Sequence, residues 1–311
     1  MGYDEGLFEV GDGLHAYLQP DGGWGWSNAG LITGGERSLL VDTLFDLKLT
    51  ATMLDRMKPV TDSRPIQTLV NTHANGDHCY GNQLVEGVEV IASAASAAEM
   101  EELPPAMLAA LMGGDFGETT NAYLAEAFGS FEFNGIEPPQ VTRTFTSSLT
   151  LDVDGRPVEL IEVGPAHTAG DVLVHVPDAK AIFTGDILFI GGTPLIWNGP
   201  VENWIQACDL IIDLGCTVIV PGHGPLTGHD GVRGVAGYLR YVRSETVARH
   251  EAGLTVFDAA RDIDLGPYDD WLDWERIVIN VDSIYRELDP GRQPTNIVDL
   301  FRMMADLKLH K

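Results

Sequence analysis

Four side chains that can bind a cation lie within six residues of one another. They are His73, Asn75, Asp77 and His78, and they follow an apolar run in the segment 67–78. The apolar run predicts a buried strand, and the polar residues after it predict a turn. Imidazole and carboxylate groups at this spacing can bind one divalent cation or two. The segment therefore predicts a metal site.

Three more potential ligands occupy the same kind of position further along the chain. His167, Asp186 and His223 each lie at a Gly-rich turn that follows a run of apolar or β-branched residues. A single histidine is more often a core or surface residue than a ligand. The recurrence of such residues at strand ends favours metal binding, because strand ends can meet at one edge of a sheet.

In order and context, these residues resemble the metallo-β-lactamase superfamily over roughly residues 10–230. The family pattern is His-x-His-x-Asp-His, followed by a His, an Asp and a final His. The chain departs from it at Asn75, where the family has its second His. The resemblance implies an α/β fold, an αβ/βα sandwich of two mixed sheets with outer helices and the metal at one edge.

The resemblance also implies two groups of ligands that share Asp186. The first, called here the complete group, contains Asp77, His78 and His223. The second, called here the Asn75 group, contains His73, Asn75 and His167. An amide oxygen is a weaker donor to zinc than an imidazole nitrogen. We expect zinc, as one or two ions per chain, with manganese or iron as alternatives. Three interpretations stay open: two ions with one labile, one ion only, or a fold with another use.

A bound ion implies hydrolytic chemistry. A metal-activated water can attack the carbonyl of an ester, thioester or lactone, and Asp77 is the candidate to orient that water or carry a proton. Asp171, four residues after His167, either accepts a hydrogen bond from a ligand N–H or caps a turn. The expected pocket residues are Trp24, Trp26 and Trp197.

The elements that must position these residues follow from the apolar pattern. Alternation predicts strands at 14–19, 29–43 and 88–92, and at short intervals over 148–220. Helical spacing predicts a helix over 47–57. Residues 96–145 have helical composition, and this insertion either caps the site or covers a sheet face.

The domain organisation follows from a change of character after residue 230. We predict a metallo-β-lactamase-like domain over 1–235, with the insertion at about 96–145. A C-terminal helical extension over 236–311 should pack on the same domain. An extension of this kind supplies either core packing or the interface of a homodimer.

Charge and composition restrict the partners. A net charge of −27 opposes binding to nucleic acid, since phosphate backbones are held by clustered Lys and Arg. No apolar stretch approaches the length of a membrane span. The N-terminus carries acids where a signal peptide has bases, and the three cysteines are scattered, so we expect a cytoplasmic protein with a small-molecule substrate.

Three features together resemble one branch of the superfamily, that of bacterial polyketide cyclases and thioesterases. They are Gly22 to Gly30, which contains Trp24, the long helical insertion, and the helix over Glu275 to Leu288. The C-terminal half lacks the basic residues of glutathione thioesterases. The leading hypothesis is a metal-dependent hydrolase of an apolar ester, thioester or lactone. The alternatives are a metal-assisted cyclase or lyase, and a non-catalytic binder with a degenerate ligand group.

Overall fold

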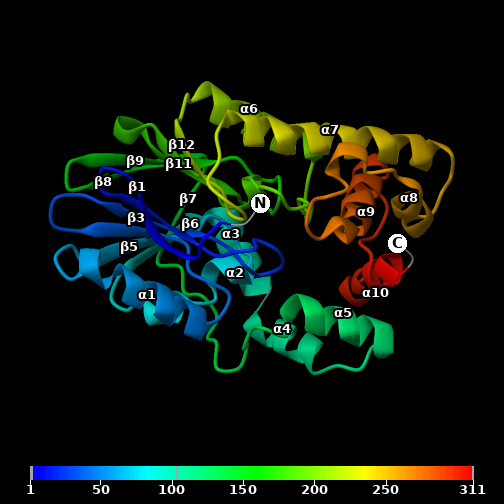
Figure 1. Ribbon diagram of the computed structural model, residues 1–311, viewed down its shortest axis with the longest axis horizontal. Coiled ribbons are helices and arrows are strands. Elements are labelled where there is room, and N and C mark those ends of the chain that lie inside the picture. The colour runs from blue at the N-terminus through cyan, green and yellow to red at the C-terminus, as the bar shows by residue number, and fades with distance from the viewer. Residues whose placement is uncertain (1–2, 103, 310–311) are drawn as a thin grey trace.

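Two β-sheets pack face to face, and helices cover their outer faces (Figure 1). The computed structural model describes residues 3–102 and 104–309. Helix α1 (Leu47–Thr61) lies outside the first sheet, whereas α6 (Val201–Asp213) and α7 (His229–Glu251) lie outside the second. The predicted α/β class and the sandwich of two mixed sheets are confirmed.

The first sheet has seven strands among the described residues, and their order in the sheet is their order in the chain. From β1 to β7 they are Gly6–Gly11, Leu14–Leu18, Ala29–Thr33, Ser38–Val41, Ile66–Val70, Glu89–Ser93 and Arg143–Phe145. Strands β1 to β4 pair antiparallel, and β4 to β7 pair parallel. Parallel neighbours need crossover connections, and α1 supplies the one between β4 and β5. The carboxyl ends of β4, β5 and β6 therefore meet at one edge.

The second sheet has five strands in the described part of the chain, in the order β12-β11-β10-β9-β8. From β8 to β12 they are Ser148–Val153, Arg156–Glu162, Val172–Val176, Ala181–Phe183 and Val218–Val220. Only the β11 and β12 pairing is parallel among them. This sheet therefore also brings two carboxyl ends to one edge.

An apolar core fills the space between the sheets. Ala16 and Ile32 face it from the first sheet, and Leu160 and Val174 face it from the second, all fully buried. Burial of alternate side chains on each strand gives the period of two that the sequence shows. The core holds the two sheets, and hence their edges, in one fixed relation.

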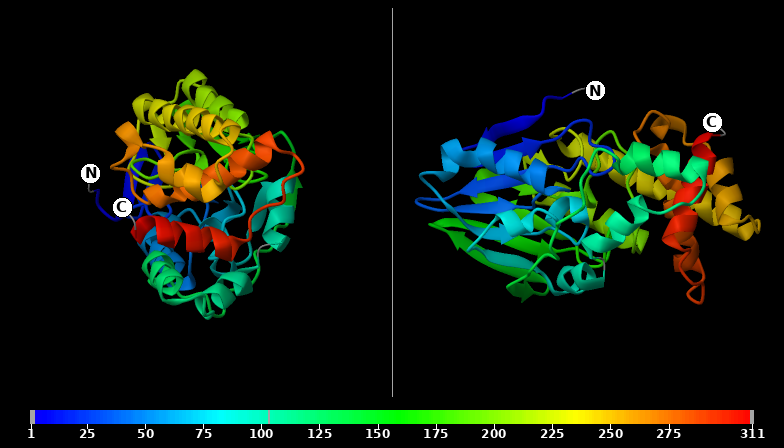
Figure 2. Two further views of the ribbon diagram at one scale, coloured as in Figure 1. Left: turned by 90° about the vertical axis from the view of Figure 1, so that its right-hand side faces the viewer. Right: turned by 90° about the horizontal axis from the view of Figure 1, so that it is seen from below.

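Helices that follow β6 and β12 gather at one end of the sandwich (Figure 2). The insertion after β6 contains α3 (Ala94–Glu102), α4 (Pro105–Met112) and α5 (Glu118–Phe128). After α7, the chain forms α8 (Val256–Asp262), α9 (Ile277–Leu288) and α10 (Ile297–Leu309). Helix α10 packs against α5, and α9 packs against α7. The two helical segments thus contact each other beyond the strand ends.

The predicted domain boundary after residue 235 falls inside α7, which is continuous from His229 to Glu251. A division at that point would cut a helix, so the separation into a domain and an extension stays a prediction. None of the helices within residues 3–102 and 104–309 combines the length and apolar character that a membrane crossing requires.

A close approach of the two sheets generates a prediction. A Cβ atom on Gly30 would lie 2.3 Å from Cε1 of Phe183, on the opposite sheet. Overpacking of this kind costs about 1–3 kcal/mol, so Gly30→Ala should lower the free energy of unfolding by that amount in urea titrations. Gly234→Ala is the matched control, because Gly234 lies in α7 with nothing within 4 Å of its Cβ position. The control should stabilise the protein by about 0.5–1 kcal/mol; equal effects would contradict this account of the sheet packing.

Candidate metal centre

The predicted ligands come together at the edge where strands of both sheets end. His73 follows β5, and Asp77 and His78 lie in the short helix α2 (Gly76–Cys79). Asp186 lies just after β11 and His223 just after β12. His167 lies in the loop between β9 and β10. The order of strands in two separate sheets, rather than closeness in sequence, brings these side chains to one point.

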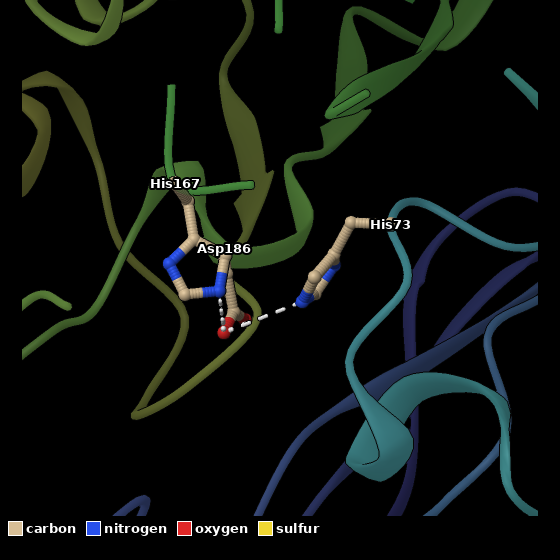
Figure 3. Close-up of side chains that lie close together, drawn as sticks. All are labelled: His73, His167 and Asp186. Atoms are coloured by element: carbon tan, nitrogen blue, oxygen red, sulfur yellow. Dashed lines mark ion pairs between the residues drawn. The ribbon is translucent and has the colours of Figure 1, made fainter. Parts of the chain in front are cut away.

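His73, His167 and Asp186 form one cluster (Figure 3). The Nε2 atoms of His73 and His167 lie 3.6 Å and 3.3 Å from Oδ2 of Asp186. All three side chains are at most 3% exposed. In Figure 3 both imidazoles point their Nε2 atoms toward the same carboxylate oxygen. Such a cluster can bind one cation.

The complete group of Asp77, His78 and His223 forms a second cluster beside the first. Nε2 of His223 lies 3.2 Å from Oδ2 of Asp77. Asp186 reaches this cluster too, because its Oδ1 is 3.0 Å from Nε2 of His78 and its Oδ2 is 3.4 Å from Nε2 of His223. Asp186 thus lies between the two clusters, as the resemblance implied.

Each imidazole is held from outside through its Nδ1 atom. The partners are Thr72 Oγ1 for His73 at 3.0 Å, Asp42 Oδ2 for His78 at 2.9 Å, the Leu195 carbonyl for His167 at 2.6 Å and the Gly22 carbonyl for His223 at 3.2 Å. A carbonyl oxygen can only accept, so the Nδ1 atoms of His167 and His223 carry protons. Their Nε2 atoms therefore face the centre, and once these atoms give up any proton to a cation, their lone pairs have the arrangement that metal binding needs.

Several atoms at the centre have no hydrogen-bond partner. Nε2 of His73, His78 and His167 and Oδ1 of Asp186 are buried without one among the described residues. Leaving a buried polar atom unpaired costs about 1–3 kcal/mol, and four such atoms converge here. Divalent cations bound by the two clusters would satisfy all of them. These residues therefore fit a metal ion.

Burial and neighbouring charges set the protonation of the ligands. Burial alone raises the pKa of Asp186, but the imidazoles of His223 and His78 outweigh it and lower that pKa well below its usual range. Burial lowers the pKa of His73, and the neighbouring His78 lowers it further. Asp186 is therefore an anion and His73 a neutral ring, the forms in which these side chains bind metals.

Asn75 lies at the start of α2, and its side chain makes no capping bond there. It lines the same cavity as Asp77, Asp186 and His223. It therefore lies next to the centre, in the position that the family pattern gives to a histidine. Its part as a ligand stays a prediction.

Sequence reasoning missed Asp42, which directly follows β4. Its carboxylate accepts bonds from His78 Nδ1 and from both the N–H and the hydroxyl of Thr72, at 2.7 to 2.9 Å. Asp42 therefore fixes the His78 ring and the start of the segment that leads to His73. The signal was available: Asp42 ends an apolar run at a sheet edge, as Asp186 does.

Asp171 takes the second of its two predicted roles. Its carboxylate accepts bonds from the N–H and the hydroxyl of Thr168 and so caps the turn after His167. The first role is wrong, since the His167 ring donates to the Leu195 carbonyl instead. A backbone acceptor that comes from a distant loop leaves no signal in the sequence.

A cavity of about 580 Å³ opens beside the ligands. Trp24 and Trp197 line it, as predicted, together with residues of α4 and of α10. Trp26 is not among the lining residues, and its ring packs against Phe131 at 4.8 Å. The prediction for Trp26 is therefore wrong, because its side chain turns into the aromatic packing behind the loop.

Comparison with known proteins agrees with this geometry. The family model of the metallo-beta-lactamase superfamily matches residues 22–223. The hydroxyacylglutathione hydrolase of Rhizobium meliloti is 32% identical over 108 residues, which make up 33% of this chain and 42% of that enzyme. The chain spans less than half the length of the curated relatives that it matches first.

Solved structures share the fold. A stereoselective inverting sec-alkylsulfatase from Pseudomonas sp. aligns with 95% of this chain and 52% of its own, at a TM-score of 0.68 and 20% identity. A metallo-beta-lactamase from Pontibacter korlensis aligns with 76% of this chain and 99% of its own, at a TM-score of 0.57 and 20% identity. Since the family match covers more than half of the sequence and includes every predicted ligand, the chain belongs to the metallo-beta-lactamase superfamily.

Proposed function

We propose that this chain is a metal-dependent hydrolase of an apolar ester, thioester or lactone. One observation carries the proposal: the cluster of buried imidazole and carboxylate groups adjoins, through Asp77, Asp186 and His223, a cavity whose other walls are mainly apolar. A site that combines a few convergent polar groups with apolar walls is the usual form of a small-molecule pocket. The substrate therefore has one polar reacting group and an apolar remainder.

Zinc suits the ligands best, since imidazole and carboxylate donors are typical of zinc sites. The complete group and Asp186 would hold one ion. His73 and His167, with Asp186 shared, would hold a second ion more weakly, because Asn75 offers an amide oxygen in place of a nitrogen. When bound, such ions supply a Lewis acid and lower the pKa of a coordinated water to about 7.

The chain itself supplies orientation and a proton acceptor. The Asp77 carboxylate lines the cavity, and one of its oxygens lies 3.2 Å from Nε2 of His223. Its other oxygen is available to orient a water toward a carbonyl carbon or to take that water's proton. Aromatic walls keep bulk water away from the reacting group, which strengthens the electrostatic interactions inside the pocket.

The similarity to hydroxyacylglutathione hydrolases supports hydrolysis of an acyl compound. The net charge of −27 makes glutathione, an anionic tripeptide, a poor ligand for this chain. The same charge makes nucleic acid a poor partner. A neutral or weakly charged small molecule fits better. Elemental analysis of the protein as isolated, followed by assays on a panel of chromogenic esters, thioesters and lactones, tests the proposal.

Replacement of Asn75 tests whether the Asn75 group binds metal weakly. Asn75→His should raise the metal content toward two ions per chain, because it restores the third nitrogen donor. Inductively coupled plasma mass spectrometry after dialysis measures this content. Asn198→His, at an exposed position, is the control for a histidine that binds metal at the surface. An unchanged metal content in Asn75→His would contradict the proposal that the Asn75 group binds metal weakly.

Replacement of Asp77 tests the proton acceptor. Asp77→Ala should lower kcat by at least about 10²-fold, the lower end of what a positioned acid or base contributes. Steady-state kinetics at saturating metal measures the loss. Asp230→Ala is the control, because the Asp230 side chain is fully exposed. Wild-type turnover in Asp77→Ala would remove this carboxylate from the mechanism.

Replacement of Asp42 tests the support of the His78 ring. Asp42→Asn keeps the shape of the side chain but removes its charge, so metal affinity should fall about 10- to 100-fold, as for other groups that hold a ligand in place. Competition with a chromogenic chelator measures this affinity. Asp55→Asn on the exposed face of α1 should leave it unchanged. Equal affinity in both variants would show that Asp42 only stabilises the fold.

A further inference from the structure

Two distant stretches of the chain meet at the wall of the cavity. The guanidinium of Arg276 lies over the ring of Trp24, at 4.2 Å from its centroid. Nη2 of Arg276 is 2.7 Å from a carboxylate oxygen of Asp273. A Cβ atom on Gly23 would lie 3.2 Å from that carboxylate. The loop that carries Trp24 is therefore pressed against an ion pair contributed by the C-terminal part of the chain.

The edge of the Trp24 ring is held by a second set of contacts. Its Nε1–H donates to the hydroxyl of Tyr123 at 3.2 Å, and that hydroxyl donates to Oε1 of Glu275 at 3.0 Å. Tyr123 belongs to α5 in the insertion, whereas Glu275 and Arg276 belong to the 3-10 helix η5 (Trp274–Arg276). Two segments, α5 and η5, thus fix the indole of the Trp24 loop at its edge and at its face.

This arrangement is costly for a purely structural contact. Arg276 is 1% exposed and Glu275 is 1% exposed, and burying charged groups costs several kcal/mol per ion before their pairing repays it. Well-packed apolar residues would hold a loop at less cost. The charged groups instead keep a planar ring in one orientation, since a guanidinium prefers the face of an indole.

The fixed ring faces a cavity with aromatic walls. Phe128 and Phe301 pack against Trp24 with ring centroids at 5.3 Å and 5.9 Å. Eight aromatic side chains are among the described residues that line the cavity: Trp24, Phe45, Tyr80, Phe116, Phe128, Phe189, Trp197 and Phe301. Aromatic rings prefer other aromatic rings in offset or edge-to-face contact. The walls therefore favour a flat, unsaturated group over a saturated one of the same size.

We propose that the apolar part of the substrate is aromatic and packs against Trp24, and that Arg276 and Tyr123 are the positioning residues that hold this ring. The identity of the ligand as a substrate rests on the proposed hydrolase function. Aromatic contacts of this kind are worth about two- to tenfold in affinity beyond the area they bury. The preference should depend on the orientation of Trp24 and so on both positioning residues.

The test compares two alcohols with one carbon skeleton, naphthylmethanol and its saturated analogue decahydronaphthylmethanol. Isothermal titration calorimetry on the metal-loaded protein should show about five- to tenfold tighter binding of the aromatic alcohol. Trp24→Leu and Arg276→Met should each reduce this preference to less than about twofold. Arg302→Met, at an exposed arginine of α10 that pairs with Asp299 of the same helix, is the matched control and should keep the preference.

Further measurements separate positioning from folding. Metal content should stay the same in every variant, and Arg276→Lys should restore part of the preference, because an ammonium group also interacts with an indole face. If Arg276→Met does not fold, Tyr123→Phe replaces it, since this change removes only the hydroxyl that accepts from Trp24. On aryl esters, the positioning variants should raise KM and leave kcat within about twofold of wild type.

Two results would overturn the inference: equal affinity of the wild type for the two alcohols, or a preference that survives Trp24→Leu. The binding assay needs no turnover. A protein that hydrolyses none of the esters but shows the Trp24-dependent preference would refute the proposed function and leave the aromatic site standing. A protein that hydrolyses the esters but shows no preference for the aromatic alcohol would refute the aromatic site and leave the proposed function standing.

Discussion

The metal centre depends on the buried carboxylate of Asp186, one oxygen of which has no hydrogen-bond partner among the described residues. Asp186 lies between the Nε2 atoms of four histidines, at 3.0 to 3.6 Å, with 3% of its side chain exposed. An isolated charge at such a position would be very costly, so the surroundings must compensate it. The outward bonds of the imidazoles turn every ring toward this carboxylate, and the unpaired atoms that result define where a cation belongs.

The sheet topology follows from the same requirement. Ligands on two sheets can converge only if strands of both end at one edge, and the parallel pairings β4 to β7 and β11 to β12 provide such ends. The packing of the two faces sets the distance between those ends. Gly30 illustrates how tight this packing is, since even a methyl group there would overlap the ring of Phe183. The core between the sheets therefore determines the geometry of the metal centre.

The sequence predicted the fold class and the positions of the ligand candidates because both rest on local pattern and on a family resemblance. Alternation marks a strand wherever one face is buried, and a polar residue at its end stands out. Contacts between distant residues left weaker signals. Asp42 was recognisable only as one more acid after an apolar run, and the bond from His167 to the Leu195 carbonyl involves no special residue type. Trp26 could not be distinguished from Trp24, because only the fold decides which indole faces the cavity.

The loop with Trp24 also connects the pocket to the metal centre. The Gly22 carbonyl accepts from the His223 ring, and the Ser27 hydroxyl donates to the Asp77 carbonyl at 2.5 Å. Both contacts reach the complete group, and neither reaches His73 or His167. The ligand group that kept all its donors is therefore the one that shares a loop with the pocket. The position of this loop therefore bears directly on His223 and Asp77. His73 and His167 make neither of these contacts, so an asparagine at position 75 leaves the connection between the pocket and the complete group unchanged.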